Sequence, residues 1–348
     1  MKQWKEPKGF RHELGPIRPP SEGGSCSLLL RVVRNCPWSL CKFCYGKPYG
    51  RGKFSLRTVE EVKEEILSME KMVEMLERGK IWEGFSLENG DGLHNFLMWF
   101  FSGSRTVFLQ DADVLFMPTP KLVEILEEVR KRLGEMERIT CYTRGRTLFK
   151  KKVEELRTLR EAGLSRLHVG LESGDEEVLR RMNKGLTPQE MVEGGRKAKE
   201  AGLELSLYYI LGLGGQDGWK EHARNTARVL NEVNPEFVRV RRLVPLKGTP
   251  LFEEWRRGDF RLQTPHGELR ELKLLVEELE FTGRLCFDHF ANPFYLTSAG
   301  PRWIFDQSYE GYRFPGEKDE VLKKIEEGLE REEALYVSSA SLSALETL

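Results

Sequence analysis

The sequence predicts an α/β protein, an open partial (β/α)6 TIM-like barrel with a C-terminal α/β extension. Three observations lead to this fold class. Strand-like and helix-like segments alternate between about residues 27 and 245, and strands joined by helices pair in parallel through right-handed crossovers. Six such units are fewer than a closed eight-stranded barrel needs. A cysteine-rich loop follows the first strand, at the end of the strands where the functional loops of such barrels lie.

Short apolar runs are the expected strands, and they cover residues 27–34, 105–110, 138–142, 165–171, 203–211 and 235–244. Runs of this length and apolar content are typical of strands buried in a parallel sheet. Between them, apolar residues spaced three or four apart predict helices over 58–76, 118–133, 150–162, 175–182, 187–202 and 219–233. Thr58 with Glu61 and Thr187 with Glu190 form capping boxes at two helix starts. Gly163 follows the third helix in the position that favours glycine.

The expected domain organisation follows from where this alternation starts, breaks and stops. We expect an N-terminal extension over 1–24, the barrel over 25–245 with an insertion at about 77–104, and a C-terminal extension over 246–335 that covers the barrel. The extension is predicted to contain a helix at 268–279, a strand at 283–289, an aromatic loop at 292–315 and a helix at 318–331. Residues 336–348 are rich in Ser and Ala, and we expect a frayed tail there.

Composition limits the possible partners and the compartment. The chain has 348 residues with 55 Lys and Arg against 55 Asp and Glu, so its net charge gives no global case for nucleic acid binding. The densest apolar run, 96–101, is too short to span a membrane. The first residues lack the apolar region of a signal peptide, so we expect a reducing, cytoplasmic location. A charged fraction of 32% suits a thermophile.

Cys36, Cys41 and Cys44 form a C-x4-C-x2-C pattern directly after the first expected strand. Thiolates this close in sequence converge on one metal centre, whereas a structural zinc site or a ferredoxin-type cluster usually takes four ligands. Three thiolates without an obvious fourth favour a [4Fe–4S] cluster with one iron left open. A zinc site completed by a distant ligand, or a disulfide with a spare thiol, also fits the pattern.

Three longer passages, at 167–185, 209–215 and 240–251, together with the cysteine loop, resemble the radical S-adenosylmethionine (radical SAM) superfamily. The branch they resemble is shared by the elongator catalytic subunit, which modifies tRNA, and oxygen-independent coproporphyrinogen oxidase. The resemblance covers about residues 25–280. Two features depart from it: the first cysteine gap holds four residues instead of three, and Gln110–Asp113 stands where relatives have Gly-Gly-Glu.

The resemblance implies a [4Fe–4S] cluster on the three cysteines and S-adenosylmethionine (SAM) bound through its open iron. It implies further SAM contacts, namely Phe43 on adenine, Asp113 and less certainly Asp111 on the amino group, Glu172 on the ribose or amino group, Lys184 on the carboxylate, and Gly212 (with Gly214 and Gly215) and Leu243 around the adenine. Plainer roles fit the same residues: a core aromatic for Phe43, a helix-dipole or structural carboxylate for Glu172, and a solvated lysine for Lys184.

The activity that the resemblance implies is reductive cleavage of SAM by an electron from a ferredoxin or flavodoxin type donor, followed by hydrogen abstraction from a small-molecule or metabolite substrate. Cys141, on a barrel strand, and Asp288 with His289, after the last expected strand, are candidate substrate residues. The identity of the substrate is open. Two alternatives stay open: radical modification of RNA, to which basic clusters at 144–152 and 239–242 would contribute, and a non-catalytic iron–sulfur protein.

Overall fold

The computed structural model describes residues 10–16, 26–44, 52–79 and 90–344. Its centre is an eight-stranded sheet with the strand order β1-β4-β5-β6-β7-β8-β9-β12. These strands are β1 (Leu28–Arg31), β4 (Thr106–Gln110), β5 (Arg138–Arg144), β6 (Leu164–Glu172), β7 (Glu204–Leu211), β8 (Phe237–Arg242), β9 (Arg284–Cys286) and β12 (Tyr312–Arg313). Neighbours from β1 to β9 pair in parallel, and β12 is antiparallel to β9.

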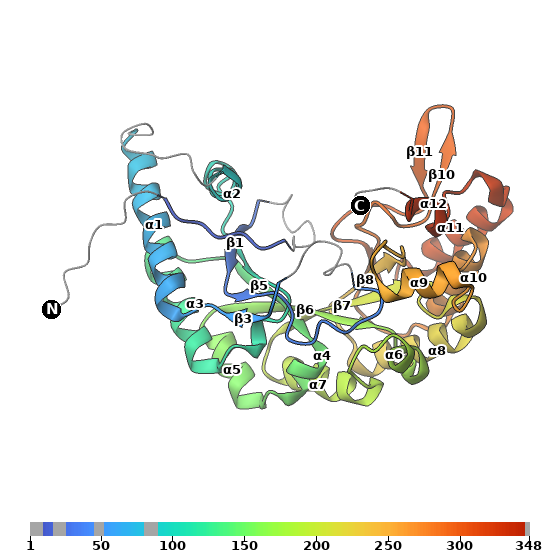
Figure 1. The fold of residues 1–348 in the computed structure, drawn as a ribbon, viewed down its shortest axis with the longest axis horizontal. Helices are drawn as coiled ribbons and strands as arrows, with labels where there is room; N and C mark the ends of the chain where they lie inside the picture. The colour runs from blue at the N-terminus through green and yellow to red at the C-terminus, as the bar shows by residue number, and fades with distance from the viewer. Residues whose placement is uncertain (1–9, 17–25, 45–51, 80–89, 345–348) are drawn as a thin grey trace.

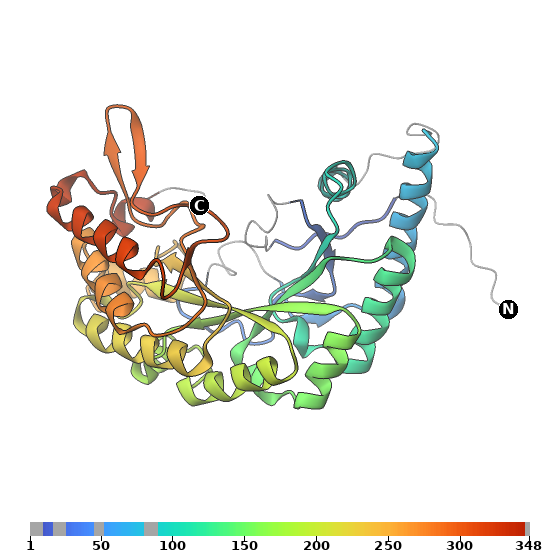
Figure 2. The same ribbon diagram turned by 180° about the vertical axis from the view of Figure 1, so that it is seen from behind.

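The predicted fold class is therefore confirmed, with one parallel strand more than the six expected. That strand is β9, which the sequence assigns to the C-terminal extension and which pairs with β8 at the open edge of the barrel. The sheet curves into an open half-barrel, and helices line its convex face (Figure 1). The view from behind shows the same crescent, with the two ends of the sheet well separated (Figure 2).

The helices largely match the periodicity of the sequence. They are α1 (Val59–Glu77), α2 (Gly90–Phe101), α3 (Thr119–Leu133), α4 (Gly145–Lys150), α5 (Val153–Glu161), α6 (Glu176–Arg181), α7 (Pro188–Glu200), α8 (Gly215–Val233), α9 (Pro250–Arg257), α10 (Pro265–Glu278), α11 (Lys318–Glu330) and α12 (Ser339–Leu342). Both capping boxes are present, since the hydroxyls of Thr58 and Thr187 accept from the backbone N–H groups of Glu61 and Glu190. Gly163 has a φ of 117° just beyond α5.

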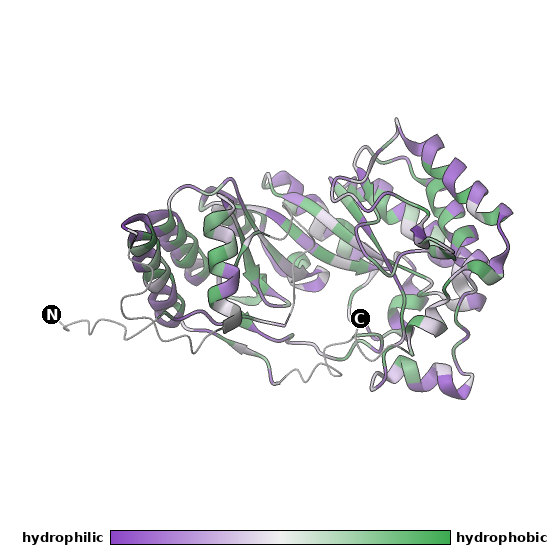
Figure 3. Cartoon of the chain, turned by 90° about the horizontal axis from the view of Figure 1, so that it is seen from above, coloured by the Kyte–Doolittle hydropathy of each residue, from purple (hydrophilic) through white to green (hydrophobic). Residues whose placement is uncertain are grey.

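The two faces of the barrel sheet differ in chemistry. Side chains facing the helices, such as Leu167, Val169 and Leu171 on β6, are buried in the apolar core. Because successive side chains of a strand point to opposite faces, the residues between them line the concave face. There the rings of Phe108, Tyr142, His168 and Tyr208 contact one another from β4 to β7. Figure 3 shows hydrophobic residues along the central strands and alternating hydrophobic and hydrophilic residues along the helices.

Four segments differ from the predicted elements. Helix α8 begins at Gly215 rather than 219, directly after the glycine turn at 212–214. The short α4 occupies the segment before α5. The aromatic loop contains a hairpin of β10 (Phe294–Thr297) and β11 (Gly300–Trp303) that projects from the body (Figure 1). Residues 336–344 are not frayed, because Tyr336 and Leu342 are buried and α12 forms; residues 345–348 lie outside the described part.

The expected insertion at 77–104 contains α2, with Phe96 and Trp99 buried in the core. The part of it between residues 80 and 89 lies outside the described residues. Within the described residues, no helix is both long enough and apolar enough to cross a membrane.

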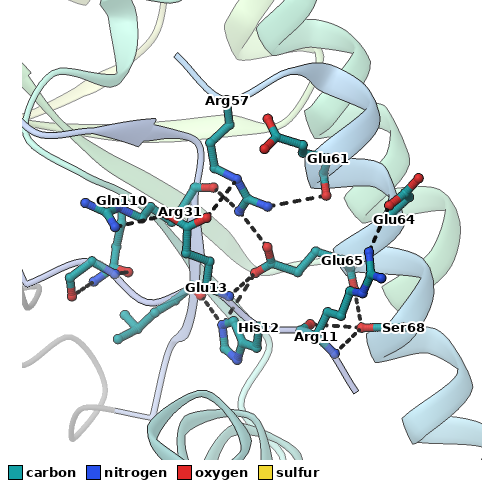
Figure 4. A network of polar contacts seen from close by, with 12 residues as sticks. Arg11, His12, Glu13, Arg31, Arg57, Glu61, Glu64, Glu65, Ser68 and Gln110 are labelled. Atoms are coloured by element: carbon teal, nitrogen blue, oxygen red, sulfur yellow. Dashed lines mark hydrogen bonds and ion pairs between the residues drawn. The ribbon is translucent and has the colours of Figure 1, made fainter. Parts of the chain in front are cut away.

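A polar network ties the N-terminal segment 10–16 to the barrel (Figure 4). The backbone N–H of Glu13 donates to Glu65 of α1 at 3.1 Å, and Arg57 pairs with the same buried carboxylate. The backbone N–H of Gly15 donates to the side chain of Gln110 at the end of β4, at 2.9 Å. The hollow beside this network holds about 360 Å³, but its charged groups largely pair with one another. We interpret the polar network as an anchor that fixes the end of β4.

The buried ion pair between Arg242 of β8 and Glu268 of α10 gives a test of how the C-terminal helices are held. The two groups lie 2.6 Å apart with side chains 1% exposed each. An Arg242→Ala variant leaves the Glu268 carboxylate buried without its cation, so we expect the free energy of unfolding to fall by about 3–5 kcal/mol. Chemical denaturation measures this.

The matched control is Arg180→Ala, which breaks the exposed pair with Glu177. Solvent screens such an exposed pair, so we expect almost no change in the free energy of unfolding. The double variant Arg242→Leu/Glu268→Leu is expected to recover most of the lost stability, because neither charge of the pair remains buried. Equal losses for the two single variants would contradict this interpretation.

Candidate functional site

The cysteine loop leaves the sheet at the carboxyl end of β1. It follows β2 (Val33–Arg34), which pairs with β3 (Ser55–Leu56) on the far side of the loop. Asn35 has a φ of 65° and its backbone N–H donates to Asp111 at 3.2 Å. Arg31 donates to the same carboxylate oxygen at 3.1 Å. Among the described residues, the other oxygen of Asp111 is buried and has no hydrogen-bond partner, so with respect to them this carboxylate has an open acceptor beside the loop.

The part of the cysteine loop from Trp38 to Lys42 contacts segments much later in the sequence. The indole N–H of Trp38 donates to the carbonyl of Asn183 at 2.7 Å, and a Cβ at Gly185 would lie 2.8 Å from the Trp38 ring. The backbone N–H of Lys42 donates to the carbonyl of Met182 at 3.0 Å. Its carbonyl accepts from Leu251 at the start of α9 at 3.1 Å. The loop is therefore fixed between the turn after α6 and the N-terminus of α9.

The three cysteines of the loop are partly buried and free of disulfides. Burial raises the pKa of the Cys41 thiol to about 11; Lys184 opposes this, while Cys44 and Cys36 add to it. Among the described residues, no three His, Cys, Asp or Glu side chains stand together as a ready metal site. The thiols are thus neighbours along one docked loop, without the convergence of a filled site.

Glu172 and Lys184 form an ion pair beside this loop. Their side-chain atoms lie 2.6 Å apart, and Lys184 lies 5.9 Å from the centre of the Phe43 ring. Burial lowers the pKa of Lys184. The carboxylate of Glu172 and the thiol of Cys41 together raise this pKa by more than burial lowers it, so the net shift is upward. Glu172 has a φ of 66°, a costly conformation for a residue with a side chain and one that clusters at functional sites.

Gly170 leaves the space that this ion pair fills. A Cβ at Gly170 would lie 2.1 Å from the Glu172 carboxylate and 2.7 Å from the Lys184 ammonium. Residues two apart on a strand share a face, so a glycine two positions before a terminal carboxylate was a usable signal in the sequence. Gly170 was not among the residues expected at the site from the sequence.

Phe43, Gly212 and Leu243 come together on the other side of the loop. Phe43 packs with Ile210 and Leu243 in a small apolar cluster. Gly212 follows β7, and a Cβ there would lie 3.8 Å from the Cβ of Leu243. Three residues that the resemblance assigns to the adenine are therefore neighbours.

Glu271 of α10 supports Gly212 and was not identified from the sequence. Its carboxyl accepts from the Gly212 N–H at 2.8 Å and from the Tyr209 hydroxyl at 2.6 Å. Burial raises the pKa of Glu271 to about 8, with Glu268 adding to the rise and the hydrogen bonds from Tyr209 and Gly212 opposing it. His222 lies 3.5 Å from this carboxyl, but burial lowers the pKa of the histidine to about 4, so the imidazole is neutral near pH 7. The group is therefore largely a neutral acid at pH 7. Helical spacing alone marks Glu271 as an ordinary polar position, so no sequence signal indicated this role.

Asp113 differs from its expected role. Its carboxylate accepts from the hydroxyls of Thr143 and Thr147 at 2.8 and 2.7 Å and from the Arg144 N–H at 3.0 Å. Burial raises its pKa, and these hydrogen bonds oppose the rise. The carboxylate thus fixes the start of α4 to β5. Asp111, the less certain of the two candidates, is the one with an open oxygen.

Of the three candidate substrate residues, Cys141 lies apart from the neighbouring pair Asp288 and His289. Cys141 is buried in the apolar core, on the face opposite to that of its neighbour Tyr142, so its thiol faces the helices instead of the concave face. Asp288 forms ion pairs with Arg239 and Arg241 at 2.8 and 3.1 Å. His289 lies beside them, and burial together with Arg241 lowers its pKa to about 4.

The basic clusters that would contribute to RNA binding are mostly engaged within the fold. Arg239 and Arg242 are buried with carboxylate partners. Arg146 pairs with Glu190 at 2.8 Å, and the guanidinium of Arg144 lies over the Trp38 ring at 5.1 Å. The cluster at 239–242 is therefore not a surface for RNA.

Fold and site together define a parallel α/β barrel with a three-cysteine loop and an ion pair at the carboxyl edge of its strands. Residues 94–227 match the model of the radical SAM superfamily. This match supports the resemblance over that part of the chain. The matched residues begin after the cysteine loop.

Two curated relatives illustrate the range of matches. A protein of Methanocaldococcus jannaschii described as uncharacterized is 28% identical, over 49% of this chain and 49% of its own length. The tRNA uridine(34) acetyltransferase of the same organism is 23% identical over 35% of this chain and 22% of its own length. The chain thus spans half or less of these relatives. Among solved structures, coproporphyrinogen III oxidase (HemN) from Escherichia coli is 16% identical, with 82% of this chain and 61% of that chain covered and a TM-score of 0.47.

The neutral carboxyl of Glu271 predicts a pH dependence of stability. Its pKa is about 8 in the folded chain and 4.5 in the unfolded chain, so the folded state holds a proton that the unfolded state releases. The free energy of unfolding should therefore decrease by a few kcal/mol as the pH rises from about 4.5 to about 8. A Glu271→Gln variant keeps an acceptor oxygen for Tyr209 and Gly212 and should lose this decrease.

Urea denaturation of both proteins between pH 5 and pH 9 measures the difference. Glu278→Gln on the exposed side of the same helix is the control and should follow the wild type. A Glu271→Gln variant whose stability falls with pH as steeply as that of the wild type would refute the assignment of a buried neutral acid.

Proposed function

We propose that this chain is a radical SAM enzyme acting on a small molecule or metabolite. The observation that carries the proposal is the meeting of the cysteine loop with Glu172 and Lys184 at the carboxyl edge of a parallel barrel, in a chain whose residues 94–227 match the radical SAM model. In the proposed reaction, an electron from a ferredoxin or flavodoxin type donor breaks the C5′–S bond of SAM, giving methionine and a 5′-deoxyadenosyl radical that takes hydrogen from a substrate C–H bond.

The donor set on the loop suits a [4Fe–4S] cluster. Cys36, Cys41 and Cys44 supply three thiols within nine residues, and none of them is engaged in a disulfide. The three thiolates would bind three irons and leave one for SAM. Ionised thiols repel one another, and metal ligands come together when the metal binds. We therefore expect the three thiols to close around the irons as the cluster is inserted. Such a cluster calls for a reducing setting, which is why the proposal includes a cytoplasmic location.

The residues beside the loop suit the polar and apolar parts of SAM. Glu172 and Lys184 present one charge of each sign, which matches the amino and carboxylate groups of an amino acid. The open oxygen of Asp111 is a second acceptor for an ammonium group. Phe43 and Leu243 provide an apolar surface for adenine. In this proposal these groups orient SAM and exclude water, while residues 25–245 form the barrel and 246–335 cover it.

Loss of the cluster ligands tests the proposal directly. We expect Cys36→Ser, Cys41→Ser and Cys44→Ser to lose most bound iron after anaerobic reconstitution and to form no 5′-deoxyadenosine from SAM and dithionite. Iron analysis, visible absorption and mass spectrometry measure these outcomes. Cys26→Ser, which changes a partly buried cysteine outside the loop, is the matched control and should retain both.

Full iron content and deoxyadenosine formation in the loop variants would refute the ligand assignment. A wild type that binds four irons but yields no deoxyadenosine would favour the non-catalytic iron–sulfur protein. Bound zinc in place of iron would point to the structural metal site.

A second variant tests the ion pair separately from the cluster. An Ala side chain at 170 would overlap both charged groups, so Gly170→Ala should weaken SAM binding about tenfold or more, the loss of one or two charge-assisted hydrogen bonds. Iron content should not change. Gly218→Ala in α8, where an added Cβ meets nothing within 4 Å, is the control. Equal SAM affinity in both variants would contradict the role of the ion pair.

RNA modification is the second candidate, because one relative is named a tRNA uridine(34) acetyltransferase. This chain spans only 22% of that relative. If RNA is the substrate, tRNA should bind with an affinity that falls steeply as salt is raised from 50 to 200 mM. Filter binding of unmodified tRNA over that range measures this, and the small-molecule proposal expects no such binding.

A further inference from the structure

Two arginines share one carboxylate at the carboxyl ends of β8 and β9. Arg239 and Arg241 lie two residues apart on β8 and therefore share a face of the sheet. Asp288, just after β9, pairs with Arg239 at 2.8 Å and with Arg241 at 3.1 Å. The two guanidinium groups carry two positive charges and the carboxylate carries one negative charge. This cluster therefore keeps one net positive charge.

The excess charge is presented by Arg241. The side chains of Arg239 and Asp288 are fully buried, whereas that of Arg241 is 18% exposed. The guanidinium of Arg239 is further engaged by Ser206 and by the carbonyl of Tyr309. His289 adds no positive charge near pH 7, because its pKa is lowered to about 4 by burial and Arg241. Asp288 stays ionised, since the two arginines outweigh the effect of burial on its pKa.

Aromatic rings on the concave face continue from this guanidinium. Arg241 lies 5.0 Å from the centre of the Tyr208 ring, and the hydroxyl of Tyr208 is 3.0 Å from that of Tyr142. The rings of Tyr142 and His168 meet edge to face at 5.7 Å. In the sheet register Arg241 lies beside Ile210, which packs, like Phe43 of the cysteine loop, against the small apolar cluster around Leu243. A charged group and an aromatic surface thus adjoin the apolar cluster next to the loop.

We propose that Arg241 binds an anionic group of the substrate, a carboxylate or a phosphate, while the adjoining carbon atoms of the substrate lie on the rings of Tyr142 and Tyr208, with the buried His168 ring packed against them. The planar fork of a guanidinium matches either anion through two parallel hydrogen bonds. The location beside the SAM residues as a substrate site rests on the proposed function. Anion binding by Arg241 itself does not require radical chemistry.

Simple aromatic anions test this site on the full chain reconstituted with iron and sulfide. Benzoate and phenyl phosphate are the probes, and uncharged benzyl alcohol is the comparison, with binding measured by calorimetry. The wild type should bind at least one anion more tightly than the alcohol. Arg241→Gln should weaken that binding about tenfold or more, and Arg241→Lys, which keeps the charge without the fork, should fall between. Preference for benzoate or for phenyl phosphate identifies the source of the anion.

Removing the competing carboxylate gives a test of opposite sign. In Asp288→Asn the guanidinium of Arg241 loses its partner, so binding of the same anion should become tighter, which a purely structural role would not produce. Arg261→Gln, which breaks the exposed pair with Asp217, is the control and should match the wild type. If Asp288→Asn does not fold, the three proteins differing at position 241 still decide the outcome.

The inference is overturned if the wild type binds neither anion, or if Arg241→Gln binds them as the wild type does. It is also overturned if Arg241→Gln weakens binding of SAM and leaves the probes unaffected, because Arg241 would then serve the SAM carboxylate. Failure of the proposed function is a separate result, since absence of deoxyadenosine would leave the measured anion binding unchanged.

Discussion

Parallel pairing of neighbouring strands from β1 to β9 is the constraint on which the rest of this structure depends. It brings the carboxyl ends of distant segments to one edge of the sheet. The cysteine loop after β1, Asp111 after β4 and Glu172 at the end of β6 meet there for this reason. Arg241 near the end of β8 reaches the same edge, on the side away from β1. Each group is supplied by a different β/α unit, and none is close to the others in sequence.

The concave face carries polar groups that a buried surface tolerates only when they are paired. Glu172 pairs with Lys184, Arg239 with Asp288, and the two hydroxyls of Tyr142 and Tyr208 with each other. The face toward the helices is mostly apolar, and its few polar groups are paired as well, as Tyr209 of β7 is with Glu271. The polar lumen is therefore held at an energetic cost that the apolar outer layer offsets.

The cysteine loop is stabilised from outside itself. Trp38 reaches Asn183, 145 residues later in the chain, and Lys42 pairs with Glu254 of α9 at 2.6 Å. Such contacts compensate for a loop whose partly buried thiols would repel one another once ionised. The C-terminal extension thus contributes to the site directly, because α9 fixes the loop and α10 supports the turn at Gly212 through Glu271.

Hydrophobic periodicity, capping boxes and cysteine spacing are local signals, so the sequence alone predicts six of the seven parallel strands, their order, most of the barrel helices and the cysteine loop. The resemblance adds Glu172, Lys184, Phe43 and Leu243 as candidates, and the structure places them near the cysteine loop. The engagement of Asp113 by Thr143 and Thr147, the orientation of Cys141 toward the helices, and the positions of Glu271 and Gly170 beside the candidate site are seen only in the folded chain. Burial, partners and free space are properties of packing between distant segments, and no local pattern in the chain encodes them.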